Sequence, residues 1–546
     1  MTFRLLSFYL ASLASAGLAA SAATPKVNWA PCPAGEFNTT LDLQCGNLTV
    51  PLDYTGTAES AEGKTVKLQL VKVLAPTQPS RGGIQMNFGG PGSPARGGTV
   101  LYGELLQALS GGEYDLIGLD PRGTGTTIPF VCTNNTFTMG QILNEIGSTI
   151  ESDNSERRSW ARGAIDANTC KEEGNADDIG EFIGTAFAAR DILSVAKAIS
   201  EDGLIRYWGI SYGTTLGATI AAMFPDNIDK MIIDGVSNTR EYYHAHADYE
   251  QWSDADLVFR YFFESCMTAQ PGECALAAFN KTASELHDDA WAFIEGLRIS
   301  PVATGTTFVD MGTFKSIILG ELKSVGGWPA MSAALFTILY GNETESKTAL
   351  QSFVQPATAT PLAIASFPIV FSQYAIHCSD RTIRLDSFEA QEQAGAFKKL
   401  YEVSRFAGDT VSPITAHCAQ WPWKAREVYQ GEFQVKTKNP ILLASNTRDA
   451  HTALRSAFNV SSGFEGSAVL EVNGTGHATF GAPSLCGFLA TRAYWQNGTL
   501  PKPGSVCDAP HPFSSYTWDD VLEEVGDQRK NSTPVEKRMA SPRWWM

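Results

Sequence analysis

Short hydrophobic runs, each ended by glycine or an acidic residue, recur along the first half of the chain. They lie at 84–88, 114–119, 204–208 and 231–233. Such runs are typical of parallel strands that are covered by helices on both faces. Helix-like stretches at 185–200 and 214–224 separate the later runs, and the order strand, helix, strand predicts an α/β fold with a mostly parallel, doubly wound sheet.

The next two candidate strands, 441–444 and 468–472, come much later. Residues 234–440 are 207 positions, whereas a crossover between parallel strands needs only about a dozen. Aromatic and helix-like runs at 249–263 and 328–340 favour a helical insertion over the strand ends. We therefore expect a large, mainly helical cap domain inserted between strands six and seven of the sheet.

Composition indicates a folded protein with more than one unit. The chain has 546 residues, 43% of them hydrophobic and 18% charged, while single cores stop growing near about 250–300 residues. Acidic residues outnumber basic ones by 58 to 41, for a formal charge of -17. A surface this negative repels phosphate backbones. We expect no nucleic-acid partner and a monomeric protein.

The N-terminus has the features of a secretory signal peptide over residues 1–22. Arg4 precedes an apolar stretch, and Ala20-Ser21-Ala22 forms a small-residue cleavage pattern. A membrane anchor is the alternative, but serines and Gly17 interrupt the stretch. We expect a secreted, extracellular glycoprotein without membrane association after signal removal. Nine N-x-[ST] sequons are candidates for glycosylation: Asn38, Asn47, Asn134, Asn280, Asn342, Asn459, Asn473, Asn497 and Asn531.

The ten cysteines are best interpreted as disulfides in an exported chain. Neither a C-x-x-C pair nor an H-E-x-x-H pattern occurs in the sequence, and we expect no metal and no cofactor. Ten cysteines allow about 945 pairings, so spacing alone leaves the connectivity open. Our hypothesis pairs neighbours in sequence: Cys32 with Cys45, Cys132 with Cys170, Cys266 with Cys274, Cys378 with Cys418, and Cys486 with Cys507.

A G-x-S-x-G pattern at 209–213 predicts a nucleophile at Ser211. It follows the apolar run 204–208 and precedes a small-residue helical stretch. A tight strand-to-helix turn needs small residues two positions before and two after the serine, and it lifts the hydroxyl clear of the sheet. The alternative is an ordinary buried serine in a turn.

A serine nucleophile needs a base and an orienting acid. Asp449 and His477 each follow one of the late strands, in the order Ser, Asp, His, and open α/β sheets place their sites at such strand ends. Asp234 also ends a strand and is the alternative acid. The alternatives for the base are three other histidines: His377, His417 and His451.

Gly89-Gly90-Pro91-Gly92 follows the run 84–88 and fits an oxyanion loop, in which backbone amides approach the tetrahedral oxygen. The predicted donors are the amides of Gly90 and Tyr212. A phosphate-binding loop is the competing interpretation, but the sequence holds no G-x-x-x-x-G-K-[ST] pattern.

Several motifs together resemble one peptidase family. They are Gln85-Met86-Asn87-Phe88-Gly89-Gly90-Pro91-Gly92, Asp120-Pro121-Arg122-Gly123-Thr124-Gly125, the Ser211 pattern, Cys266 with Cys274, and Gly476-His477 followed by Pro483-Ser484-Leu485-Cys486. The chain is similar, over roughly residues 30–510, to the tripeptidyl aminopeptidase-like branch of the prolyl aminopeptidase family. This resemblance implies an α/β-hydrolase fold with a cap, a TAP-like C-terminal segment, and Ser211, Asp449 and His477 as the triad.

The chain departs from the family pattern at two places beside the site. Ala450-His451-Thr452-Ala453 stands where relatives commonly have a proline-containing run, and Phe88 stands where prolyl aminopeptidases have histidine. These departures leave the triad intact and put the substrate preference in doubt. The expected divisions are the signal peptide 1–22, the core at 23–235 and 431–512, the cap at 236–430, and a C-terminal tail at 513–546.

The leading hypothesis is a secreted serine exopeptidase that removes short peptides, such as tripeptides, from free N-termini. The substrate ammonium needs an anion in the cap, for which Glu241, Asp248 and Glu250 are candidates; solvated surface acids are the alternative. A second hypothesis is an esterase, lactonase or amidase that acts on a small molecule with the same triad. A third is a catalytically dead binding glycoprotein, against which the complete triad argues.

Overall fold

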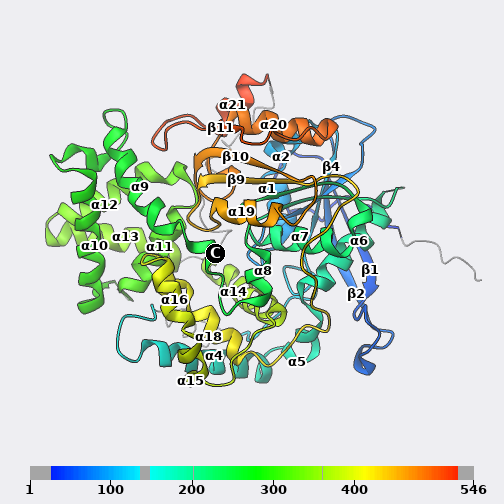
Figure 1. The fold of residues 1–546 in the computed structure, drawn as a ribbon, viewed down its shortest axis with the longest axis horizontal. Coiled ribbons are helices and arrows are strands. Elements are labelled where there is room, and N and C mark those ends of the chain that lie inside the picture. The colour runs from blue at the N-terminus through cyan, green and yellow to red at the C-terminus, as the bar shows by residue number, and fades with distance from the viewer. Residues whose placement is uncertain (1–25, 136–147, 201, 306, 359–360, 527–546) are drawn as a thin grey trace, which may run out of the picture.

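The computed structural model describes residues 26–135, 148–200, 202–305, 307–358 and 361–526 (Figure 1). The predicted signal peptide, Asn531 and the last part of the predicted tail lie outside these residues. Within them, a nine-stranded sheet forms the centre of one part of the molecule.

The sheet confirms the predicted α/β fold. Its strand order is β1-β2-β4-β3-β5-β6-β9-β10-β11, and only the β1/β2 and β2/β4 pairs are antiparallel. Every residue of β3 and β5 is buried, as expected for central parallel strands with two covered faces. The strands are Leu43–Pro51, Thr65–Val73, Gly83–Asn87, Asp115–Leu119, Ile205–Ile210, Ile228–Asp234, Leu442–Arg448, Ala468–Thr475 and Val506–Asp508 for β1–β6 and β9–β11.

Helices cover both faces of the sheet and form two hydrophobic cores. Helices α6, α7 and α19 pack on one face, while α1, α2, α20 and α21 pack on the other. The bounds are α1 Ala95–Leu101, α2 Gly103–Leu109, α6 Thr185–Ile199, α7 Tyr212–Met223, α19 Leu454–Ser461, α20 Leu485–Asn497 and α21 Trp518–Glu524. Helix α21 lies in the predicted tail, and its Trp518 and Val521 are buried in the second of these cores.

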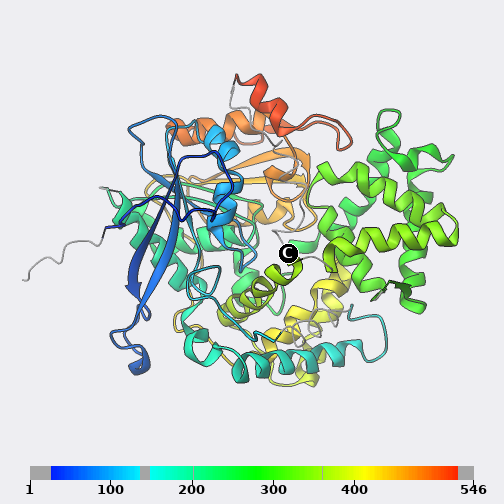
Figure 2. The ribbon, with the colours of Figure 1, turned by 180° about the vertical axis from the view of Figure 1, so that it is seen from behind.

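The segment between β6 and β9 is mostly helical. Figures 1 and 2 show α9–α13 as a lobe beside the sheet, and this lobe has its own aromatic-rich core. The bounds are α8 Thr239–His244, α9 Ala255–Thr268, α10 Ala283–Ile299, β7 Val302–Thr304, β8 Thr307–Val309, α11 Met311–Glu321, α12 Trp328–Tyr340, α13 Glu343–Thr358, α14 Pro361–Asp380, α15 Phe388–Ala394, α16 Ala396–Val403, α17 Gly408–Val411 and α18 Pro413–Gln420.

A segment after β4 also packs with the cap, although it lies within the predicted first part of the core. It contains α4 (Ser155–Glu172) and α5 (Ala176–Ile179). A Cβ on Gly163 of α4 would stand 3.0 Å from the Ala416 oxygen of α18, so the two helices approach closely. His417 Nε2 lies 2.7 Å from the Asp166 carboxylate, which adds an ionisable contact between them. The helices that cover the strand ends thus come from two separate segments, one after β4 and one between β6 and β9.

All ten cysteines form disulfides, in the predicted pairing of sequence neighbours. Cys132–Cys170 fastens α4 to the loop after β4, and Cys378–Cys418 joins α14 to α18. Both lie in one small hydrophobic cluster with Trp421 and Trp423. These two bridges therefore tie together the helices that roof the strand ends.

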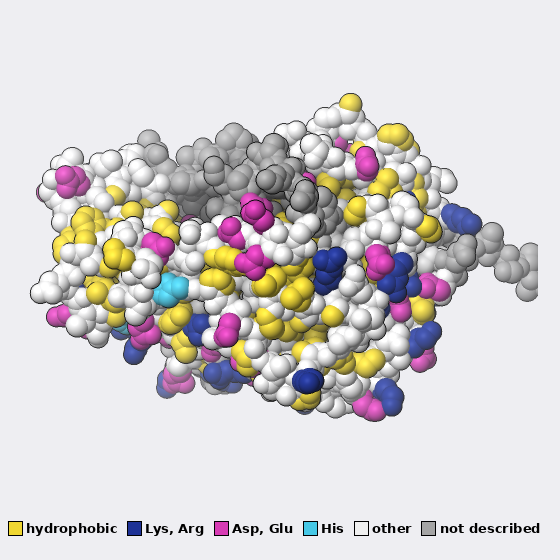
Figure 3. All heavy atoms as spheres, turned by 90° about the horizontal axis from the view of Figure 1, so that it is seen from above, with side chains coloured by type: hydrophobic (Ala, Val, Ile, Leu, Met, Phe, Trp, Pro, Cys, Tyr) yellow, Lys and Arg dark blue, Asp and Glu magenta, His cyan; other side chains and the backbone are white. Residues whose placement is uncertain are grey.

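Figure 3 shows one face of the molecule, on which acidic, basic and hydrophobic side chains are all visible among other residues. Among the described residues, none of the helices combines the length and the apolar character that crossing a membrane requires.

Candidate active site

Ser211 occupies the turn between β5 and α7. Its backbone has φ 59° and ψ -126°, a strained conformation for a residue with a side chain. Glycine is needed on both sides, because a Cβ on Gly209 would stand 2.1 Å from the Gly213 oxygen, and one on Gly213 would stand 2.7 Å from the Asn87 oxygen. The turn thus has the shape that the G-x-S-x-G pattern predicts, with a half-buried serine at its apex.

Asp449 and His477 form a hydrogen-bonded pair at the ends of β9 and β10. His477 Nδ1 lies 3.0 Å from Asp449 Oδ2. Burial opposes ionisation of Asp449, but the attraction of His477 and hydrogen bonds from His477, Ala478 N and Thr452 lower the pKa of the carboxyl below its usual value. A buried carboxylate in this position fixes the tautomer of the imidazole and stabilises its protonated form.

Asp234, the alternative acid, has a different position and role. Its carboxylate accepts the Thr479 backbone N–H at 2.8 Å and the Thr479 hydroxyl, and its backbone oxygen accepts the Ser211 N–H at 2.9 Å. Asp234 therefore joins the loop that carries His477 to the turn that carries Ser211. Burial raises its pKa to about 6, although the Thr479 hydrogen bonds oppose this.

The predicted oxyanion loop lies directly against the serine turn. Gly89 and Gly90 have φ 90° and 102°, which favours glycine. A Cβ on Gly89 would stand 2.8 Å from Ser211 Cβ and 3.0 Å from Tyr212 N, so this close approach also requires glycine. Gly90, Ser211 and Tyr212 line a common cavity.

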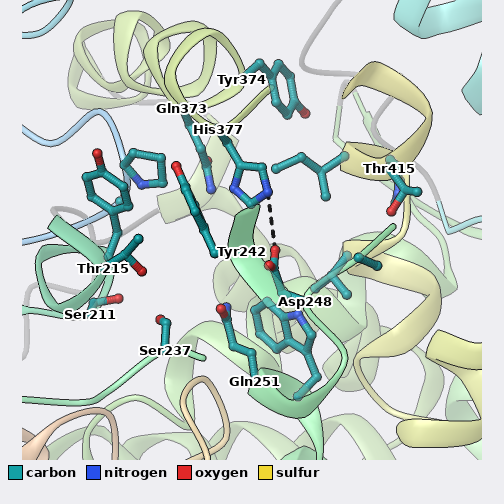
Figure 4. Close-up of a pocket in the computed structure, with 18 of the residues that line it drawn as sticks. Ser211, Thr215, Ser237, Tyr242, Asp248, Gln251, Gln373, Tyr374, His377 and Thr415 are labelled. Atoms are coloured by element: carbon teal, nitrogen blue, oxygen red, sulfur yellow. Dashed lines mark ion pairs between the residues drawn. The ribbon is translucent and has the colours of Figure 1, made fainter. Parts of the chain in front are cut away.

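That cavity has a volume of about 230 Å³ and lies between the strand ends and the cap. Figure 4 shows Ser211 and Thr215 at one side, Asp248 and His377 in the middle, and Thr415 at the other side. Further lining residues come from the cap, including Trp252, Leu400, Val411 and Ile414. The cavity can thus hold part of a substrate beside Ser211, in contact with side chains of the cap.

Asp248 is the one carboxylate among the described residues that line the cavity. Arg381 Nη2 donates to both of its oxygens at 3.0 Å, and His377 Nε2 lies 3.3 Å from Oδ2. Burial, and secondarily the nearby Arg381, lower the pKa of His377 to about 4, with Asp248 opposing. His377 is therefore neutral at pH 7, and Arg381, which is not part of the cavity wall, is the cationic partner of Asp248.

The other two candidate acids for substrate binding lie elsewhere. Glu241 accepts the backbone N–H of Glu250 at 2.7 Å. Glu250 accepts the Ser456 hydroxyl at 2.8 Å and the Asn238 amide at 3.1 Å, so it connects α19 to the start of the cap. Neither is among the described residues of the cavity wall. The sequence-based expectation for a substrate contact now rests on Asp248.

Glu241 should make stability depend on pH in a specific way. Burial raises its pKa to about 7, with Asp248 and Glu250 adding to the effect and the Glu250 N–H opposing it. A carboxyl whose folded-state pKa is raised contributes stability at low pH that is lost as the pH rises through that value. Replacing Glu241 with glutamine should therefore raise the melting temperature, relative to wild type, more at pH 8 than at pH 5. A difference in melting temperature between the two proteins that is the same at pH 5 and pH 8 would contradict the assignment.

Three further residues lie around His477 and Asp449, and none of these contacts was predicted from the sequence. Lys323 in the cap accepts the His477 backbone N–H on its oxygen at 2.7 Å, and burial lowers the pKa of its amine to about 8 although Asp449 opposes this. Thr452 donates to Asp449 Oδ2 at 2.7 Å. The buried ring of His451 lies 5.2 Å from that of His477. A hydroxyl three residues after Asp449 was the one signal available in the sequence.

Within the part of the chain that the structure describes, one group of side chains has the spacing of metal ligands: Cys32, Glu36 and Cys45. Both of its sulfur atoms are joined in a disulfide, so the group lacks the thiolates that would bind a metal ion.

Comparisons with known proteins agree with this geometry. Residues 88–379 match a family model described as alpha/beta hydrolase fold, and residues 404–507 match one described as TAP-like protein. The chain is 26% identical to a tripeptidyl aminopeptidase of Streptomyces lividans over 90% of this chain and 88% of the relative. It is 25% identical to the serine protease Hip1 of Mycobacterium tuberculosis over 88% and 91%.

Solved structures of hydrolases also overlap most of the chain, at low overall similarity. A meta-cleavage product hydrolase from Pseudomonas fluorescens has a TM-score of 0.31 and 10% identity, and covers 74% of this chain and 85% of its own. An esterase from Exiguobacterium antarcticum has a TM-score of 0.30 and 12% identity, with 76% and 90% covered. The two family models extend from the oxyanion loop to the last strand, and the chain belongs to the α/β-hydrolase family as a TAP-like serine hydrolase.

Proposed function

We propose that this protein is an exported serine exopeptidase that releases short peptides, such as tripeptides, from free N-termini. The observation that carries the proposal is the carboxylate of Asp248 in the same cavity as Ser211. The names of the relatives, a tripeptidyl aminopeptidase and a serine protease, support peptide hydrolysis.

In the proposed reaction, Ser211 Oγ attacks the scissile carbonyl while His477 takes the hydroxyl proton. The Gly90 and Tyr212 amides hold the tetrahedral oxyanion. His477 then protonates the leaving amine, the C–N bond breaks, and the N-terminal peptide remains as an ester on Ser211. Water, deprotonated by His477, hydrolyses that ester and restores the serine. Asp449 keeps Nδ1 protonated throughout, so that Nε2 is the atom that exchanges the proton.

The cap supplies the preference for chain ends. Its helices α14, α16, α17 and α18 contribute to the cavity wall around Asp248, and a substrate ammonium placed there would gain a charge-assisted hydrogen bond. Since His377 is neutral at pH 7, the carboxylate keeps one cationic partner, and that partner lies outside the cavity wall.

Export is supported by the covalent features of the chain. Five disulfides persist best in an oxidising compartment. The asparagines of the eight sequons that begin within the described residues are all exposed, as glycan attachment requires. These features support secretion, and a soluble substrate outside the cell follows from the proposal.

Acetylating the N-terminus of a peptide substrate should lower kcat/KM by at least about tenfold, because it removes the charge that Asp248 binds. Replacing Asp248 with asparagine should raise KM for the free peptide and leave the acetylated one unchanged. The matched control is Glu250 to glutamine, which alters a half-buried acid outside the cavity. Equal turnover of free and acetylated peptides would instead favour the esterase or amidase alternative.

A further inference from the structure

A buried chain of hydroxyl groups connects the residue after the nucleophile to the cap. The Tyr212 hydroxyl lies 2.5 Å from Thr185 Oγ1, and Thr185 Oγ1 donates to Asp380 Oδ2. When Asp380 is ionised it accepts the single hydroxyl proton of Thr185, and Tyr212 is then the donor to Thr185. All three residues are buried, with exposed fractions of 6%, 0% and 0% for Tyr212, Thr185 and Asp380.

This chain of hydroxyl groups joins three elements that meet beside the serine. Tyr212 begins α7, Thr185 begins α6, and Asp380 is the last residue of α14 in the cap. Asp380 also accepts the Thr185 backbone N–H at 2.8 Å on Oδ1 and the Tyr242 hydroxyl at 3.0 Å. Each group in the chain thus has a defined donor or acceptor, which is the condition under which a buried polar network rigidifies a site.

The position of Tyr212 matters because its backbone N–H belongs to the strained turn. Ser211 has φ 59°, a conformation that persists only when surrounding structure holds it. The direction of the Tyr212 N–H is set by the peptide plane between these two residues, and anchoring the Tyr212 side chain restrains that plane from the other end.

We propose that Thr185, held by Asp380 of the cap, is a positioning residue that orients the Tyr212 amide toward the oxyanion. The inference rests on the proposed roles of Ser211 and Tyr212. It makes the seating of the cap on α6 part of the catalytic geometry, since the acceptor at the end of the hydroxyl chain belongs to α14.

The competing explanation is that Thr185 only stabilises the fold, and another hydroxyl pair in the protein is a matched control for it. Thr219 on α7 shares a hydrogen bond of 3.0 Å with the Tyr243 hydroxyl and donates to the Thr215 oxygen. This pair is equally buried, and its hydroxyl hydrogen bonds join Thr219 to Tyr243 and to the Thr215 oxygen rather than to the Tyr212 hydroxyl. Removing the same atoms from this pair should cost stability alone.

The experiment compares Thr185→Val and Tyr212→Phe with Thr219→Val and Tyr243→Phe. Four quantities are measured for each variant: kcat and KM on p-nitrophenyl acetate, the rate of labelling by a fluorophosphonate, and the melting temperature. Thr185→Val and Tyr212→Phe should each lower kcat and the labelling rate about tenfold and leave KM within about twofold of wild type. This loss of kcat is smaller than the about 10²- to 10³-fold loss caused by removing an oxyanion donor, because the Tyr212 amide remains present. The double variant Thr185→Val/Tyr212→Phe should be no slower than the slower of the two single variants, because each single variant already removes the same hydrogen bond between Tyr212 and Thr185.

The two control variants should lower the melting temperature by a similar amount and keep kcat within about twofold. The inference is overturned if Thr185→Val keeps wild-type kcat, or if Thr219→Val loses as much kcat as Thr185→Val. Should Thr185→Val fail to fold, Tyr212→Phe against Tyr243→Phe decides alone. Failure of the proposed function looks different, because free and acetylated peptides would then be turned over equally while the wild-type protein is still labelled at Ser211.

Discussion

Replacing Ser211 with alanine is expected to lower kcat/KM on a peptide substrate by about 10⁴- to 10⁶-fold, because the covalent route disappears and only oxyanion stabilisation and binding remain. We expect this large effect because the strained turn presents Ser211 at its apex, beside Gly89 and in the wall of the same cavity as Gly90. The measurement is the rate of release of a chromogenic amine from a tripeptide amide. Substrate binding should be retained in the variant.

The control for this prediction is Ser194→Ala. Ser194 is a half-buried serine on α6 that donates to the Arg190 oxygen, and its removal should leave the rate within about twofold. Residual activity in Ser211→Ala above one per cent of wild type would show that another nucleophile carries the reaction.

Replacing Asp449 with asparagine is expected to lower kcat about 10³- to 10⁴-fold, because the imidazole loses the carboxylate that selects its tautomer and stabilises its positive charge. Asp234→Asn should cost less than about tenfold, since the amide oxygen can still accept the Thr479 backbone N–H. Steady-state kinetics of both variants at pH 8 measure the difference. A larger loss in Asp234→Asn would reverse the assignment of the acid.

The strand pattern and the candidate triad could be predicted from sequence for a physical reason. Central parallel strands are buried on both faces, so they appear as short apolar runs, and the predicted runs 84–88 and 204–208 correspond to β3 and β5. The chemistry sits at the ends of such strands, where Ser211, Asp449 and His477 follow β5, β9 and β10. The helix expected over 328–340 coincides with α12.

Features that depend on distant contacts escaped prediction. Strands β1 and β2 lie near the edge of the sheet and are covered on one face only. Buried and exposed positions therefore alternate along much of their length, and they lack a continuous apolar run. Helix α4 packs with the cap because of contacts with α18, more than 200 positions away. The distinction between Asp248 and the neighbouring acids Glu241 and Glu250 depends on which of them faces a cavity, which charge patterning does not encode.

Covalent labelling tests whether Ser211 is the nucleophile of a working serine hydrolase. The folded protein is treated with a fluorophosphonate, and the modified residue is located by peptide mapping, with Ser211→Ala and Asp449→Asn in parallel. We expect one adduct, on Ser211, which is absent from Ser211→Ala and forms far more slowly in Asp449→Asn. An adduct on a different residue, or a folded wild-type protein without any adduct, would contradict this role of Ser211.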